Sequence, residues 1–98
     1  MTGVRIEKLS YSARFQAEFK ALSSDAQKAC IEALKTLQSH PQSKSLRLHT
    51  LKGMPKPTIW KIDVYTNHSW QVTFELVGTT AELKRIGTHK AIDRDPRG

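Results

Sequence analysis

Residues 60–76, WKIDVYTNHSWQVTFEL, alternate between apolar and polar side chains on either side of a short polar connection. The apolar positions are Trp60, Ile62 and Val64 before the connection and Trp70, Val72, Phe74 and Leu76 after it. A period of two is typical of strands that bury one face, and residues 66–69 have the length of a hairpin loop. The stretch therefore predicts two antiparallel strands whose apolar faces point into one core.

A last strand is predicted downstream, at residues 81–88, after a turn that contains Gly78. Strict alternation from Ala81 would bury Arg85 and expose Ile86. We therefore expect a bulge near Gly87, or a strand that is covered partly on both faces. The polar residues 93–98 are expected to form a flexible tail.

Two helices and two short strands are predicted upstream. Residues 4–6 alternate and indicate a first strand. The apolar spacing of Tyr11, Phe15, Phe19 and Leu22 predicts a helix that Ser10 or Ser12 caps. A second helix is predicted to begin with the capping box Ser24-Asp-Ala-Gln27 and to end at about His40, before Pro41. Its predicted buried face consists of Ala26, Ala29, Cys30, Ala33, Leu34 and Leu37. Leu46 and Leu48 then alternate with Arg47 and His49, which predicts a half-buried strand.

This order predicts one α+β domain that spans residues 1–98. Short connections favour antiparallel neighbours, so we expect a twisted sheet of three or four strands with the helix pair packed on one face. The opposite face would then collect polar side chains. These are Arg47, His49, Lys61, Asp63, Tyr65 and Gln71.

The charge of the chain is strongly one-sided. Sixteen Lys and Arg residues stand against nine Asp and Glu residues, which gives a formal net charge of +7. Between Pro41 and Ile62 there are five basic residues and no acidic one, namely Lys44, Arg47, Lys52, Lys56 and Lys61. Such a segment beside His49 indicates an anionic partner, and RNA is the first expectation.

Other features exclude several classes of protein. The single cysteine, Cys30, cannot form an internal disulfide, which fits a reducing cytoplasm, and its place on an apolar stripe predicts a core residue. No apolar run is long enough for a membrane span, and the first residues lack the apolar region of a signal peptide. No Cys pair, His-x-x-x-His pattern or acidic cluster indicates a metal site, so we expect neither a metal nor another cofactor.

Four motifs, in this order and spacing, resemble those of the RelE/ParE superfamily of bacterial toxins, and most closely its RelE/YafQ branch of mRNA interferases. They are Leu48-His-Thr-Leu-Lys-Gly53, Trp60-Lys-Ile-Asp-Val64, Trp70-Gln-Val-Thr-Phe74 and Arg85-Ile-Gly-Thr-His89. Each motif is short, but together with the helix pair they cover nearly the whole chain. The resemblance implies a toxin of a type II toxin–antitoxin system that is neutralised by an acidic antitoxin. It also implies that the toxin enters the ribosomal A site and cuts mRNA without a metal.

The resemblance also implies roles for individual residues. His49 matches a histidine of the YafQ-type motif, His89 matches the histidine that closes the Gly-Thr-His motif, and Lys61 matches a basic residue of RelE. Histidine suits proton transfer near neutral pH, so we expect His49 and His89 to share the acid and base roles. Lys52, Lys61 and Arg85 are expected to hold the scissile phosphate. Contacts with RNA are expected from Arg47, Lys56, Tyr65, His68, Arg85 and Lys90.

Several of these residues also have a purely structural interpretation. His68 fits a plain hairpin turn, and Lys56 fits an exposed loop residue equally well. The phase of Trp60 and Trp70 favours core positions over base stacking, which leaves Tyr65 as the better stacking candidate.

The chain departs from the family pattern at three places. Gln71 stands where most relatives have arginine, Asp63 replaces a lysine, and no aromatic residue follows His89 in Lys90-Ala-Ile-Asp93. These departures favour a histidine-based variant of the chemistry. Two other functions stay open, a ParE-like inhibitor of DNA gyrase and a degenerate toxin that is retained as an interaction module, because the fold alone does not distinguish them.

Overall fold

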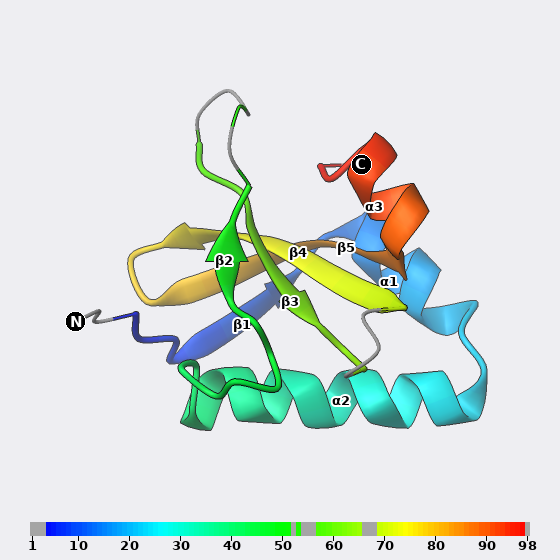
Figure 1. The fold of residues 1–98 in the computed structure, drawn as a ribbon, viewed down its shortest axis with the longest axis horizontal. Coiled ribbons are helices and arrows are strands. Elements are labelled where there is room, and N and C mark those ends of the chain that lie inside the picture. The colour runs from blue at the N-terminus through cyan, green and yellow to red at the C-terminus, as the bar shows by residue number, and fades with distance from the viewer. Residues whose placement is uncertain (1–3, 52, 54–56, 66–68, 98) are drawn as a thin grey trace.

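A computed structural model describes residues 4–51, 53, 57–65 and 69–97. Its elements, in chain order, are β1 (Lys8–Tyr11), α1 (Ala13–Lys20), α2 (Ser24–Ser39), β2 (His49–Thr50), β3 (Trp60–Asp63), β4 (Trp70–Val77), β5 (Thr80–Thr88) and α3 (His89–Arg94). The strands form one sheet in the order β1-β5-β4-β3-β2 (Figure 1). β1 runs parallel to β5, and the other neighbours are antiparallel. The predicted α+β architecture is therefore confirmed, with a mixed rather than wholly antiparallel sheet.

The centre of the sheet is the pair of hairpins that the alternating pattern predicts. Ile62, Val72 and Ile86 lie side by side across β3, β4 and β5, and each is at most 2% exposed. Gly78 has a φ of +62°, a left-handed conformation that glycine adopts at little cost, and it turns the chain from β4 into β5. These strands carry the core because each contributes an unbroken apolar row to the same face.

The helices α1 and α2 start at serine caps. The Ser12 hydroxyl accepts a hydrogen bond from the amide of Phe15, and the Ser23 hydroxyl accepts one from the amide of Ala26. The second cap lies one residue before the predicted capping box, and α2 ends before Pro41 as expected. No helix in the described ranges is long and apolar enough to cross a membrane.

α2 packs its apolar stripe on one face of the sheet, where Cys30, Leu34 and Leu37 join the core cluster of Ile62 and Val72. Cys30 is fully buried, and this burial raises the pKa of its thiol from 9.0 to about 12. The prediction that Cys30 is a core residue is confirmed.

Both short strands before the hairpins differ from the predictions. The first strand lies at Lys8–Tyr11 instead of residues 4–6, and the expected strand from Leu46 is reduced to His49–Thr50. Leu46 and Arg47 instead belong to a turn, in which Arg47 has a φ of +48°. A left-handed residue breaks the alternation, so the faces on either side of Arg47 do not follow from a period of two.

The expected irregularity in the last strand is present, but at a different residue. Thr73 pairs with Arg85 and Phe74 pairs with Leu83, so Lys84 is the extra residue of the bulge, not a residue near Gly87. The bulge resets the alternation, so Ile86 faces the core on the same side as Leu83, while Arg85 points to the opposite face. Both side chains are buried, so the alternative expectation of a strand that is covered on both faces is confirmed.

The C-terminal segment forms the helix α3 up to Arg94, so the first residues of the expected tail have a regular conformation. α3 packs across the face of the sheet that lies opposite α2 (Figure 1). Ile92 is fully buried, and the Thr73 hydroxyl donates to the carbonyl oxygen of Pro96 at 2.7 Å. The second face is therefore partly covered, not open as the sequence suggested.

Candidate functional site

His49 and Lys61 lie together at the β2 edge of the sheet. They are direct partners in the antiparallel pair of β2 and β3, and directly opposite residues in such a pair point to the same face. The prediction that these two residues share a face is therefore confirmed for the backbone. Lys61 is only 5% exposed, so its charge lies largely away from bulk water.

The ring of His49 has a defined orientation. Its Nδ1 atom contacts the carbonyl oxygen of Arg47, and a carbonyl oxygen can only accept a hydrogen bond. The proton of the neutral ring is therefore assigned to Nδ1, and the lone pair to Nε2. In this tautomer Nε2 can act as a proton acceptor.

α3 brings a second histidine and a carboxylate to the same face. His89 is the first residue of α3 and Asp93 lies one turn later, a spacing that places both on one side of a helix. The Nδ1 atom of His89 is 3.0 Å from Oδ2 of Asp93, and Oδ1 of Asp93 is 3.7 Å from Nζ of Lys61. Asp93 thus connects His89 to Lys61.

The four residues His49, Lys61, His89 and Asp93 form what we call the two-histidine cluster. It offers two imidazole groups, one largely buried ammonium group and one carboxylate. Two imidazoles can donate and accept protons near neutral pH, while a buried cation stabilises negative charge more strongly than an exposed one. No group of three potential metal ligands occurs among the described residues.

Asp93 is the member of the cluster that the sequence analysis missed. The six residues of α3 are too few to show a helical spacing of apolar side chains, so the sequence does not indicate a helix there. The available signal was the four-residue spacing between His89 and Asp93 after Thr88, whose hydroxyl caps α3 by accepting from the amide of Ala91.

Arg47 lies beside the cluster but is engaged by a buried acid. Its Nε atom is 2.8 Å from Oδ2 of Asp63, a fully buried side chain, while Arg47 itself is half exposed. The side-chain amide of Gln71 donates to Oδ1 of the same carboxylate at 3.0 Å. Two departures from the family pattern, Asp63 and Gln71, therefore form one buried polar network with Arg47.

Arg85 is buried between α1 and α3. Its Nη2 atom lies 2.6 Å from Oε2 of Glu18, and its Nη1 atom donates to the carbonyl oxygens of Ala91 and Asp95 at 3.1 and 2.8 Å. A guanidinium group that is committed to these partners holds both helices to β5. Its donors are therefore directed at protein acceptors and not at a bound phosphate.

The other predicted contact residues are dispersed. Lys90 is exposed on α3, and Tyr65 is half-buried just after β3. Lys52, Lys56 and His68 lie outside the described residues. The described part of the candidate site therefore rests on the two-histidine cluster and on Arg47.

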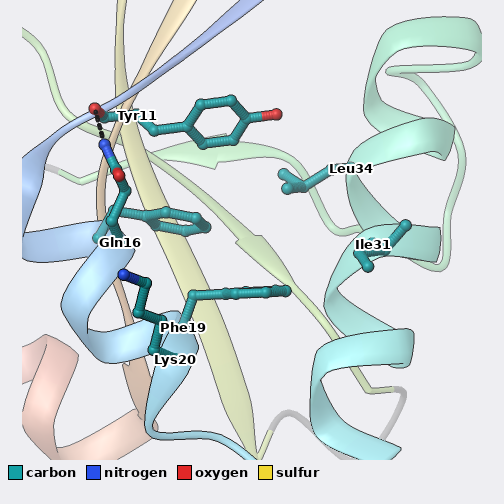
Figure 2. Close-up of a pocket in the computed structure, with 7 residues that line it drawn as sticks. Tyr11, Gln16, Phe19, Lys20, Ile31 and Leu34 are labelled. Carbon is teal, nitrogen blue, oxygen red and sulfur yellow. Dashed lines mark hydrogen bonds between the residues drawn. The ribbon is translucent and has the colours of Figure 1, made fainter. Parts of the chain in front are cut away.

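A separate apolar groove lies between α1 and α2 (Figure 2). Its volume is about 370 Å³, and it is lined by Tyr11, Phe15, Gln16, Phe19, Lys20, Ile31 and Leu34. The amide of Gln16 donates to the carbonyl oxygen of Tyr11 at its edge. The lining contains no histidine or carboxylate, so acid–base chemistry is not expected there.

No protein-family model matches the sequence. No curated protein matches it either.

Solved structures do match the fold. A variant of the E. coli toxin RelE in the free state aligns with a TM-score of 0.69 at 16% identity, over 94% of this chain and 93% of that chain. YafQ in the E. coli DinJ–YafQ toxin–antitoxin complex aligns with a TM-score of 0.63 at 20% identity, over 89% and 98% of the two chains. The archaeal RelE–RelB complex from Pyrococcus horikoshii aligns with a TM-score of 0.66 at 8% identity, over 88% and 96%. The chain therefore has the fold of the RelE-like toxins.

Proposed function

We propose that this protein is the toxin of a type II toxin–antitoxin pair and acts as a ribosome-dependent mRNA endoribonuclease. The observation that carries the proposal is the two-histidine cluster, in which His49 lies opposite the largely buried Lys61 across the β2–β3 pair and Asp93 connects His89 to the same ammonium group. The fold supports the toxin role, because RelE and YafQ are toxins with the same architecture.

The chemistry that fits these groups is internal transfer at phosphorus. One histidine removes the proton of the 2′-hydroxyl, and the 2′-oxygen forms a bond to the adjacent phosphorus. The bond from phosphorus to the 5′-oxygen breaks, and the other histidine gives its proton to that leaving oxygen. Each step moves one proton, so the two histidines exchange protonation states over the reaction.

Lys61 supplies the electrostatic part of the mechanism. The phosphorane carries more negative charge than the substrate, and a preorganised cation stabilises it with little reorganisation. The side chain of Lys61 is 7% exposed, so water screens its charge only weakly. Arg47, half exposed beside the cluster, is placed to contact a neighbouring phosphate.

The partners follow from charge and from the size of the site. A basic chain of net charge +7 favours ribosomal RNA as a docking surface, and the ribosome would hold the mRNA in position for so few catalytic groups. An acidic antitoxin would compete for the same basic face. Similar structures include toxin–antitoxin complexes, in which DinJ is bound to YafQ and RelB is bound to RelE.

The test is the cleavage of ribosome-bound mRNA by the wild type and by His49→Ala and His89→Ala variants. Loss of one proton-transfer group should lower the cleavage rate by about 10²–10⁴-fold. His40→Ala is the matched control, because His40 is exposed at the end of α2, away from the cluster.

Mapping mRNA 5′ ends after a short induction, beside a gyrase supercoiling assay, separates the alternatives. Codon-phased ends that disappear in both cluster variants support the ribonuclease. Loss of supercoiling without new ends would instead identify a gyrase inhibitor, and neither effect would identify a degenerate toxin.

A further inference from the structure

We infer that Asp93 is a positioning residue that fixes the ring of His89 and compensates the buried charge of Lys61. This inference rests on the proposed function, because it assigns a role within the same site. Asp93 lies in the segment of residues 90–93 after the closing histidine, where the family resemblance leads one to expect an aromatic side chain. The carboxylate is therefore a feature of this chain's own chemistry.

The backbone of Asp93 is held from three directions. Thr88 caps the start of α3, Ile92 is fully buried against the sheet, and Arg85 donates to the carbonyl oxygens of Ala91 and Asp95 on either side. A six-residue helix would not be stable alone in water, so these contacts determine where α3 lies. These contacts thus place the Asp93 carboxylate beside Lys61 of β3.

The two oxygens of Asp93 serve two different groups. Oδ2 lies 3.0 Å from Nδ1 of His89, a hydrogen-bond distance, so it holds the proton on Nδ1 and leaves Nε2 of the neutral ring as the acceptor. Without such a partner a neutral imidazole distributes its proton between both nitrogens. A carboxylate behind the ring also stabilises the imidazolium that forms when Nε2 takes a proton.

Oδ1 acts on Lys61. Among the described residues, Asp93 provides the one carboxylate that pairs with this largely buried ammonium group. The separation of 3.7 Å is longer than a hydrogen bond, so the pairing balances charge without consuming an N–H donor. Those donors remain available for phosphate oxygens.

Helix stability does not account for Asp93. It is the penultimate residue of α3, and a carboxylate near the C-terminal end of a helix interacts unfavourably with the helix dipole. Its side chain is 52% exposed, so its burial contributes little to the core. The contacts with His89 and Lys61 therefore account for a carboxylate at this position.

The experiment compares Asp93→Ala with Glu32→Ala. Both changes remove one carboxylate from an exposed helical position, but Glu32 lies on α2, and among the described residues its carboxylate pairs only with the exposed Lys35. Long-range ¹H–¹⁵N NMR of the histidine rings at alkaline pH reports the tautomer of His89 without any need for activity. We expect His89 to be the Nδ1–H tautomer in the wild type and in Glu32→Ala, and a mixture in Asp93→Ala.

Cleavage of ribosome-bound mRNA should fall about tenfold to a hundredfold in Asp93→Ala and stay unchanged in Glu32→Ala. If Asp93→Ala does not fold, Asp93→Asn keeps the shape of the side chain and removes the charge beside Lys61. An unchanged His89 tautomer, or a cleavage rate within about twofold of the wild type, overturns the inference. A wild-type protein that cleaves no RNA would overturn the proposed function instead, while the ring measurement still decides the role of Asp93.

Discussion

Replacement of Arg85 by methionine should cause a large loss of stability, because Arg85 connects α1 and α3 to the last strand. Its side chain is 8% exposed and that of Glu18 is 20% exposed, so their ion pair is shielded from water. Nε and Nη2 of Arg85 both donate to the Glu18 carboxylate, while Nη1 reaches two carbonyl oxygens around α3. The methionine variant removes all of these Arg85 donors.

The size of the stability loss depends on the partners that Glu18 keeps. Removal of one partner of a buried ion pair costs about 3–5 kcal/mol. Glu18 keeps some access to water and still accepts from the amide of Ile86, so the lower end, about 3 kcal/mol, applies. For a domain of this size, that loss corresponds to a decrease in Tm of about 10–25 °C.

Arg14→Met is the matched control for this prediction. Arg14 pairs with the same Glu18 carboxylate at 3.3 Å, but its side chain is 49% exposed. An exposed pair contributes about 0–1 kcal/mol, so this variant should unfold close to the wild type. Urea denaturation followed by circular dichroism measures both free energies of unfolding. If Arg85→Met unfolds like the wild type but no longer cleaves RNA, then Arg85 is an RNA ligand and the reasoning from burial is refuted.

Three further changes test other parts of the structure. Lys61→Met should lower cleavage by about 10²-fold with unchanged stability, because methionine fills a similar volume and the Asp93 carboxylate that loses its partner is 52% exposed and stays hydrated; a lower free energy of unfolding in urea would contradict this. Gly78→Ala should cost about 1 kcal/mol by the same measurement, since alanine is strained at a φ of +62°; no loss would indicate that the turn relaxes. Burial raises the pKa of the Cys30 thiol to about 12, so the unfolded chain loses this proton first and stability should fall as the pH rises from about 9 towards 12. Cys30→Ala should flatten that dependence in urea titrations at several pH values, and iodoacetamide should label Cys30 only on unfolding.

The sequence predicted those elements in which the spacing of apolar residues marks the buried face. The alternation around Ile62 and Val72 and the stripe of α2 each reflect a face that meets the core, so β3, β4 and α2 were placed within about a residue. β1 carries no such signal, since its four residues are mostly exposed and its place depends on backbone pairing with β5. An edge strand in which Leu9 is the one residue packed against the core offers no alternation from which its position could be located.

The candidate site was predictable where it lies on the sheet and unpredictable where it depends on α3. His49 and Lys61 share a face because their strands pair, and that follows from alternation and chain order. Asp93 enters the site because α3 is held against the sheet by the buried Ile92 and by Arg85, which donates to the carbonyl oxygens of Ala91 and Asp95. The four-residue spacing from His89 indicates a shared helix face, but it does not show that this helix packs beside Lys61.

Two of the three departures from the family pattern, Asp63 and Gln71, are connected to the orientation of His49. Asp63 is fully buried and receives both the Nε of Arg47 and the amide of Gln71. Its own backbone amide donates to the carbonyl oxygen of Leu46 at 2.7 Å, so the turn at Leu46 and Arg47 is attached to β3 through both main chain and side chain. The carbonyl oxygen of that attached Arg47 is the group that accepts from Nδ1 of His49. A lysine in place of Asp63 would repel Arg47 and release the turn, and His49 would lose the support that leaves its Nε2 free to accept a proton. The acidic and amide residues at these positions are therefore consistent with a site whose chemistry depends on histidine.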